Sequence, residues 1–220
     1  MATTVEVKSR EPASQPAAGP PWHVKHQRAL MAVAGLIAAA AIIGWFVLAS
    51  GKRKEQFAAR SLNQARAAAE AGNLPLASSE LQRLISTYKG TDAAHEAVIT
   101  LNQVRMVNGQ SELAAVGLRD FVAAKPPVKY LAPAYGLLGA ALENSKRWAD
   151  AGSAFMQASA AAEVPYLKAT YLVDAGRAYR EAGRTTEAAK AYRTILEKYA
   201  ETPSFTEAQV RLAELTGGKM

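Results

Sequence analysis

The fold of this chain can be inferred from the stretch Glu181–Pro203, EAGRTTEAAKAYRTILEKYAETP. It holds no nucleophile beside a base, no cluster of metal ligands and no phosphate-binding loop. Its apolar residues follow the spacing of an amphipathic helix. A lone helix would have no counterpart elsewhere in the chain, whereas a repeat would, so the meaning of the stretch depends on whether other segments match it.

A matching segment lies upstream, and the interval from Ala71 to Ala182 gives its offset, 111. The residues that recur at that offset include Ala71, Gly72, Ala77, Tyr88, Glu96, Ala97 and Leu101. Because 111 is three times 37, two further copies should lie between. Steps of 37 from Gly72 reach Gly109, Lys146 and Gly183, and steps from Ala77 reach Ala114, Ala151 and Ala188. The chain therefore contains four copies of one repeat with a period of 37.

Each copy has the pattern of two helices joined by a tight turn. In the last copy the first helix carries one apolar stripe, formed by Leu172, Ala175, Gly176 and Tyr179. Gly183 follows as a helix-ending residue, and the second helix has its own stripe of Ala188, Tyr192 and Ile195 before Pro203. We expect the small residues to let the paired helices approach closely while the tyrosines fill the space beside them.

This spacing resembles the tetratricopeptide repeat. The third copy shows the same pattern, whereas in the second copy Asn102 and Arg105 depart from it. The resemblance implies an all-α solenoid of about four helix pairs with a capping helix. We place the repeat domain at 58–216, with units at 58–94, 95–131, 132–168 and 169–203 and the cap at 204–216. The alternative is an ordinary helical bundle with accidental periodicity.

An uncharged segment, 29–51, precedes the repeats. As a helix it would span about 35 Å, enough for a bilayer core of about 30 Å. A cleaved signal peptide would have a shorter apolar region. A buried core helix is disfavoured by the basic residues Lys25 and Arg28 before it and Lys52 to Lys54 after it. We therefore predict a single transmembrane helix, preceded by a disordered tail at 1–28 and followed by a linker at 52–57.

The distribution of charge argues against nucleic-acid binding. Residues 1–54 contain seven basic and two acidic residues, a net charge of +5, whereas residues 55–220 contain 19 and 17, a net charge of +2. A nucleic-acid partner would require a basic face on the folded domain. His23 and His26 lack a third metal ligand nearby, and His95 stands alone. We therefore expect no cofactor, no metal and no catalysis, although a hydrolase or transferase site without a recognisable motif stays an alternative.

Stacked helix pairs form a concave groove lined by the first helix of each pair. In the tetratricopeptide pattern four positions of each unit face that groove. We predict that proteins or peptides bind to these positions, which include Leu62, Arg66, Ile99, Gln103, Met106, Asn144, Val173, Arg177 and Arg180. At any one position the alternative is a solvated helix face. Leu62 and Ile99 occupy the slot of the lysine in the carboxylate clamp of chaperone-tail-binding relatives, so that activity is not expected.

The layout of the whole chain resembles the bacterial ancillary SecYEG translocon subunit (YfgM-like) family. The features that carry this resemblance are the short tail, the anchor containing Ile43-Gly44-Trp45, the charged exit and the repeats. The resemblance implies a single-pass inner-membrane protein with a cytoplasmic N-terminus and a periplasmic repeat domain. Its implied partners are translocon subunits and periplasmic folding factors. The alternative is a scaffold for envelope assembly or cell division. Basic residues flank both ends of the anchor, so charge does not fix the orientation.

Overall fold

The computed structural model of the chain describes residues 26–218, and every regular element in this range is helical. The described residues divide into two units, one that ends at Ser50 and one that begins at Gly51. Most of the predicted tail at 1–28, namely residues 1–25, lies outside the described residues.

Helix α2 spans Gln27–Glu70 and includes both the predicted membrane segment and the first helix of the first repeat. Residues 52–57, predicted as a linker between the two, are part of this helix. The physical reason is that residues 52–60 contain no proline and several strong helix formers, and one glycine at position 51 weakens a helix without ending it. The predicted linker is therefore a helical segment.

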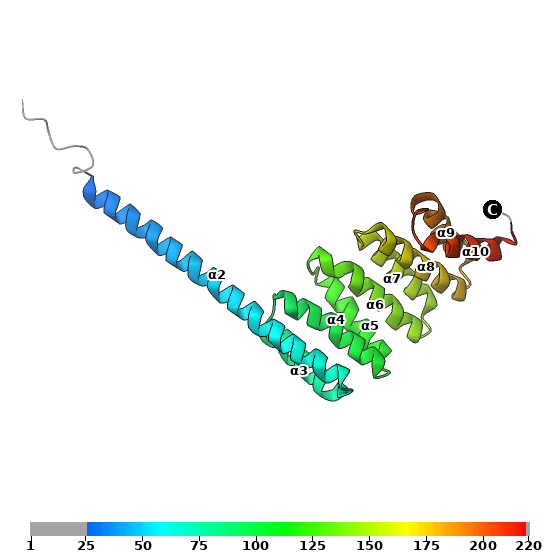
Figure 1. Cartoon of the computed structure of the whole chain (residues 1–220), viewed down its shortest axis with the longest axis horizontal. Coiled ribbons are helices and arrows are strands. Elements are labelled where there is room, and N and C mark those ends of the chain that lie inside the picture. Colours follow the sequence, from blue (N-terminus) through cyan, green and yellow to red (C-terminus); the bar gives the residue numbers. More distant parts are fainter. Residues whose placement is uncertain (1–25, 219–220) are drawn as a thin grey trace, which may run out of the picture. The chain divides into compact units, whose positions relative to one another are not determined.

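The repeat domain is a stack of helix pairs, as Figure 1 shows. The end of α2 is followed by α3 (Leu74–Thr87), α4 (Asp92–Val107), α5 (Ser111–Ala123), α6 (Leu131–Asn144), α7 (Trp148–Ala161), α8 (Pro165–Glu181), α9 (Thr185–Lys198) and α10 (Ser204–Thr216). A short 3-10 turn, Val128–Tyr130, precedes α6. The predicted all-α solenoid of four helix pairs and a capping helix is confirmed.

The turn inside each pair requires a residue with a positive φ angle. Gly72, Gly109 and Gly183 have φ angles of 79°, 74° and 71°. Lys146 occupies the same repeat position in the third pair with a φ angle of 58°. Glycine adopts this conformation without a steric cost, whereas a residue with a Cβ atom adopts it only at a cost in free energy. The third turn is therefore strained where the other three are not.

Glycines and aromatic rings pack together within the third and fourth pairs. A Cβ atom added to Gly139 would lie 2.6 Å from the ring of Phe155, and one added to Gly176 would lie 2.5 Å from the ring of Tyr192. Both distances are too short for real atoms, so each ring occupies the space that the glycine leaves. The predicted close approach of the paired helices therefore depends on these two glycines.

Buried side chains form two clusters in the repeat domain. The N-terminal cluster comes from α2, α3 and α4, between Ala58 and Val104, and its buried members are Ala, Leu and Val. The C-terminal cluster, between Ala114 and Leu212, also contains five buried aromatic residues, which are Phe121, Tyr130, Phe155, Tyr179 and Tyr192. The two halves of the stack therefore differ in how they fill their interiors.

Polar contacts link residues that are one repeat apart. The Glu55 carboxylate accepts hydrogen bonds from the backbone N–H groups of Asp92 and Ala93, each at 2.9 Å, so a residue of α2 caps the N-terminus of α4. The Asp92 carboxylate in turn accepts from Lys129 Nζ at 2.7 Å. Hydrogen bonding to Lys129 lowers the pKa of Asp92. These contacts fix the register between the first three units.

Candidate partner-binding groove

Two of the nine predicted groove residues are core residues. Leu62 is 3% exposed in the N-terminal cluster and Val173 is 7% exposed in the C-terminal cluster. Neither can contact a partner unless the helices repack, so the prediction for these two positions is wrong. The physical reason is that this repeat position lies between neighbouring helices. At the equivalent position in α6, an added Cβ atom on Gly136 would lie 2.5 Å from Tyr171 of α8.

Two other apolar groove residues, Ile99 and Met106, are half-buried. Both belong to α4, yet both pack against the C-terminal cluster. They fill the junction between the second and third units and offer only part of their surface to a partner. Asn144, the last residue of α6, is exposed.

Arg66 and Gln103 lie together at an open part of the first-helix face. With Ala69, Glu70, Leu74, Thr100, Val104 and Val107 they line a hollow of about 380 Å³ between α2 and α4. Val107 is 75% exposed at its rim. The Arg66 guanidinium lies 3.0 Å from Glu96, and the two side chains are 43% and 44% exposed. Exposed ion pairs of this kind are weak, so Arg66 is free to exchange Glu96 for an acidic group of a partner.

Arg177 is held by carboxylates of its own chain. Its guanidinium lies 3.2 Å from Glu143 of α6 and 3.0 Å from Asp174 of α8. Burial raises the pKa of Glu143 and of Asp174 from their ordinary values, and the contact with Arg177 opposes the rise in both. Two half-buried carboxyls therefore depend on this arginine, which makes Arg177 a structural residue as well as a predicted groove residue.

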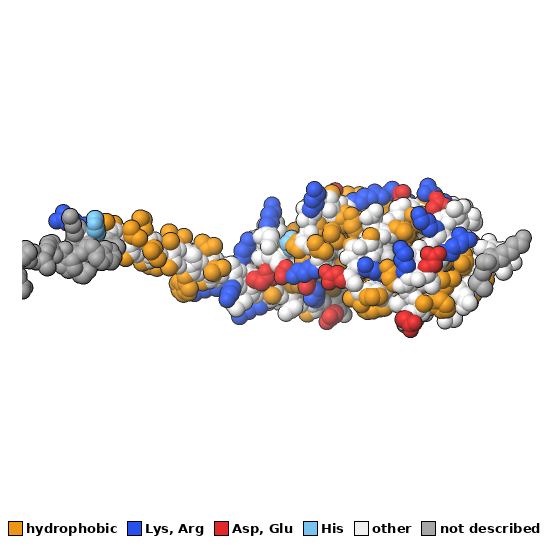
Figure 2. Space-filling model, turned by 90° about the horizontal axis from the view of Figure 1, so that it is seen from above, with side chains coloured by type: hydrophobic (Ala, Val, Ile, Leu, Met, Phe, Trp, Pro, Cys, Tyr) orange, Lys and Arg blue, Asp and Glu red, His pale blue; other side chains and the backbone are white. Residues whose placement is uncertain are grey.

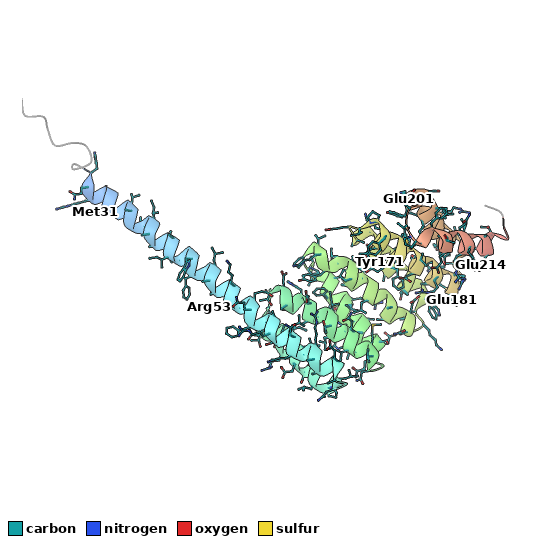
Figure 3. All side chains as sticks on the ribbon, in the orientation of Figure 1. Met31, Arg53, Tyr171, Glu181, Glu201 and Glu214 are labelled. Carbon is teal, nitrogen blue, oxygen red and sulfur yellow. The ribbon has the colours of Figure 1, made fainter. Side chains whose placement is uncertain are left out.

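Arg180 is also paired within the chain. It lies 3.1 Å from Glu181 of its own helix and 3.7 Å from Glu214 of the capping helix. In Figure 3, Glu181 and Glu214 lie at the same end of the last helix pair and its cap. Arg177 and Arg180 are therefore both engaged within the chain, whereas Arg66 and Gln103 line the hollow between α2 and α4.

A second hollow, of about 230 Å³, was not predicted from the sequence. His95, Val98 and Phe121 line it, with Lys89 and Lys125 beside them. The Nδ1 atom of His95 is buried and has no hydrogen-bond partner among the described residues. The sequence held one signal for this site, because the repeat positions equivalent to His95 are Ala58, Ala132 and Ala169. A polar ring in a column of alanines marks a local departure from the packing of the other units.

No metal site is formed by the histidines within the described range. Residues 26–218 contain no group of three or more His, Cys, Asp or Glu side chains placed to hold a metal ion. His23 lies outside this range, so the pair with His26 is not described.

Comparison with known proteins gives one match to a family model and several to solved structures. Residues 171–202 match the model described as tetratricopeptide repeat. This segment covers most of α8 and the whole of α9, the pair with the clearest glycine–aromatic packing. No curated protein sequence matches the chain.

The structural neighbours have low sequence identity but share the fold over most of the chain. The MamA protein has 20% identity and a TM-score of 0.57, with coverage of 73% of this chain and 81% of its own. A protein of nearly identical TPR-like repeats from Podosopora anserina has 18% identity and a TM-score of 0.59, with coverage of 75% and 87%.

A tetratricopeptide repeat protein from Parabacteroides merdae has 12% identity and a TM-score of 0.58, with coverage of 74% and 61%. This neighbour and the two above agree in fold with the stack described here. Together with the match of the last helix pair, they show that the chain has the fold of a tetratricopeptide-type solenoid.

Proposed function

We propose that this protein is a membrane-anchored scaffold that binds proteins or peptides and has no catalytic activity. The observation that carries the proposal is the open hollow at Arg66, Gln103 and Val107 on the first-helix face. It combines an exposed apolar side chain, a neutral amide and a weakly paired guanidinium. This chemistry suits an extended or helical segment that carries apolar residues next to an acidic one.

The anchor in this proposal is the first half of α2. Within it lies an 18-residue window with a mean hydropathy of 2.4, which is long and apolar enough to cross a membrane. Its large apolar side chains are more than half exposed in the described structure, among them Leu36, Ile42, Trp45 and Leu48. Exposure of so long a row of apolar side chains to water is unfavourable, so we expect lipid or another protein to cover it.

The accessory role in secretion is the finer part of the proposal. It rests on the resemblance in layout to the ancillary SecYEG translocon subunit family, which implies that residues 1–28 lie in the cytoplasm and the repeats in the periplasm. In that arrangement the hollow would meet chains that emerge from the translocon. The partners would be translocon subunits, periplasmic folding factors or their clients.

Crosslinking in intact membranes, followed by mass spectrometry, tests the role. We expect translocon subunits or periplasmic folding factors to be joined to residues around the hollow. Recovery of envelope-assembly or division proteins at the same residues would contradict the secretion role and favour the alternative scaffold. A set of crosslinks that avoids the hollow altogether would overturn the binding site.

The orientation has a separate test. Alkaline phosphatase fused after Met220 is active only outside the cytoplasm, so an active fusion is expected. A fusion that is inactive at normal expression would place the repeats inside the cell and would remove the secretion role.

A further inference from the structure

The connections between successive helix pairs lie along one edge of the repeat domain, together with the start of its first helix (Figure 1). Lys54 Nζ of α2 donates to the carbonyl oxygen of Lys89 at 2.8 Å, which joins α2 to the α3–α4 connection. The contact of Asp92 with Lys129, at 2.7 Å, extends the edge to the α5–α6 connection. We call the residues 51–57, 88–91, 124–130 and 162–166 the loop edge.

The loop edge carries a group of basic side chains without acidic partners. Lys52, Arg53, Lys54, Lys89 and Lys125 are exposed. In the part of the chain that the structure describes, none of them forms an ion pair. In Figure 2, Lys and Arg side chains stand out from the surface of the first half of the repeat domain.

The acidic residues near the basic group are already engaged. Glu55 caps α4, and Asp92 pairs with Lys129, whereas Glu163 is exposed farther along the edge. At the opposite edge Arg147 and Arg184 pair with carboxylates, whereas Lys146 is exposed and forms no ion pair with the described residues. The loop edge near α2 differs because it gathers five such basic side chains, and this group favours a negatively charged surface.

Exposed apolar side chains accompany the basic ones. Phe57 is 55% exposed, Val128 is 63% exposed, and Val164 and Tyr166 are 44% and 53% exposed. They come from α2 and from two successive connections. Aromatic and aliphatic side chains interleaved with Lys and Arg are typical of protein surfaces that enter the interface of a bilayer.

We propose that the loop edge lies on the headgroup layer of an anionic bilayer, beside the point where the chain enters the membrane. The proposal rests on the membrane anchor of the proposed function. If residues 29–51 span the bilayer, Lys52 to Lys54 must lie at its surface, since they follow directly in the same helix. Lys89 is bonded to Lys54, so the next connection is held at the same level.

The occupant of this surface is lipid. Each basic residue close to an anionic membrane surface strengthens binding severalfold, and the effect fades beyond about 8–10 Å in physiological salt. Five unpaired cations on one edge therefore outweigh the exposed Glu163. On an anionic bilayer the repeat domain would lie close against the surface.

The test uses single-cysteine variants, because the natural chain contains no cysteine. Val128→Cys places a fluorescent label on the loop edge. Val107→Cys places one at the opposite edge, where the side chain is 75% exposed, and serves as the matched control. The full-length chain is inserted in nanodiscs of phosphatidylcholine alone or with phosphatidylglycerol, and brominated lipids quench any label that reaches the interface.

We expect quenching at position 128 to be severalfold stronger than at position 107 in anionic discs. High salt or the double substitution Lys89→Gln/Lys125→Gln should reduce it with no loss of helix content. Equal quenching at the two positions would overturn the proposal. Quenching at position 128 that is the same with and without anionic lipid, or with and without Lys89 and Lys125, would also overturn it. Shielding of the label that appears only in native membranes would overturn it too, because a protein would then cover the edge.

Failure of the anchor can be told apart in the same preparations. A chain that does not migrate with the discs at high salt has no anchor, and both proposals fail. A chain that migrates with the discs while position 128 stays unquenched keeps the anchor and refutes only the lipid contact of the loop edge.

Discussion

The two halves of the repeat domain fill the space between their helices with different kinds of side chain. In the third and fourth pairs, the rings of Phe155 and Tyr192 pack on glycines, and Arg177 of the first-helix face pairs with Glu143 and Asp174. In α2, α3 and α4 the buried cluster is built from Ala, Leu and Val, and a hollow of about 380 Å³ stays open between α2 and α4. The C-terminal half thus packs aromatic rings on glycines, whereas the N-terminal half has smaller buried side chains and a hollow on its first-helix face.

In the second pair the small residue at the helix crossing lies on the second helix instead of the first, and the fold is kept. Where the later pairs have glycine on the first helix, this pair has Asn102, which is buried and donates from Nδ2 to the carbonyl oxygen of Val98 at 2.8 Å. The glycine moves to the second helix as Gly117, where an added Cβ atom would lie 2.8 Å from Asn102 Oδ1. The requirement is one small residue at each crossing, and either helix can provide it.

The largest expected effect comes from filling a glycine of the C-terminal half. Gly176→Ala should lower the free energy of unfolding by about 1–3 kcal/mol, because its Cβ atom would press on the Tyr192 ring. Gly51→Ala is the matched control, since nothing lies within 4 Å of a Cβ atom there and helix propensity favours alanine. Urea unfolding of the full chain in detergent, followed by circular dichroism, measures both. If Gly176→Ala is as stable as the natural protein, the packing account is wrong.

A double-mutant cycle at Asn102 and Gly117 should reveal the reversed crossing. Gly117→Ala alone should destabilise the fold, because Asn102 and Arg105 occupy the space. In a chain that already carries Asn102→Ala, Gly117→Ala should lower the free energy of unfolding much less. We expect a coupling energy of about 1 kcal/mol between the two positions in urea unfolding. Additive effects would show that the two residues do not share this space.

The strained turn of the third pair gives a smaller effect of opposite sign. Lys146→Gly should raise the free energy of unfolding by about 0.4–1 kcal/mol, because glycine adopts the positive φ angle more readily than lysine. Gly183→Ala, at the equivalent turn of the fourth pair, should lower it by a similar amount. Thermal unfolding of both variants checks the pair, and a loss of stability in Lys146→Gly would contradict the strain.

The smallest effect concerns protonation. Burial raises the pKa of Glu143 and Asp174, so these carboxyls cost stability at neutral pH, and the fold regains it as the pH falls through their raised pKa values. The pKa of Asp92 is lowered, so its contribution is present above the ordinary value of 3.8 and is lost as the pH falls through the folded pKa.

Substitution of Arg177 or Lys129 tests how each basic side chain affects the pKa of the carboxyls that it contacts. Arg177→Met should raise the pKa of Glu143 and Asp174 further, whereas Lys129→Met should return the pKa of Asp92 toward its ordinary value. Carbon-13 NMR of the carboxyl groups measures these shifts. An unchanged pKa at Glu143 in Arg177→Met would show that the arginine does not stabilise the carboxylate.

The sequence predicts the fold well because the same pattern recurs in several copies, and each copy supports the interpretation of the others. Gly72, Gly109 and Gly183 recur at one position and predict the turns, and the stripe around Tyr192 predicts the inner face of a helix. Side-chain exposure on the first helices is harder to predict. Leu62 and Arg66 are one helical turn apart, yet one is buried and the other exposed, since the difference depends on how the next helix packs.

The ion pairs of Arg177 were missed for a related reason. Its partner Glu143 lies on a different helix in the preceding unit, and the spacing within one helix gives no sign of such a contact. The chain of contacts from Glu55 to Asp92 and Lys129 was predictable in principle, because each step equals the repeat period of 37.

The most direct test of the open N-terminal face is site-specific photocrosslinking in intact membranes. A photoreactive amino acid replaces Gln103 at the hollow or Asn144 at the end of α6, both of which are exposed polar residues of the predicted groove. We predict severalfold more crosslinked partner protein at position 103 than at position 144. Equal or stronger crosslinking at position 144 would contradict the assignment of partner binding to the first two units.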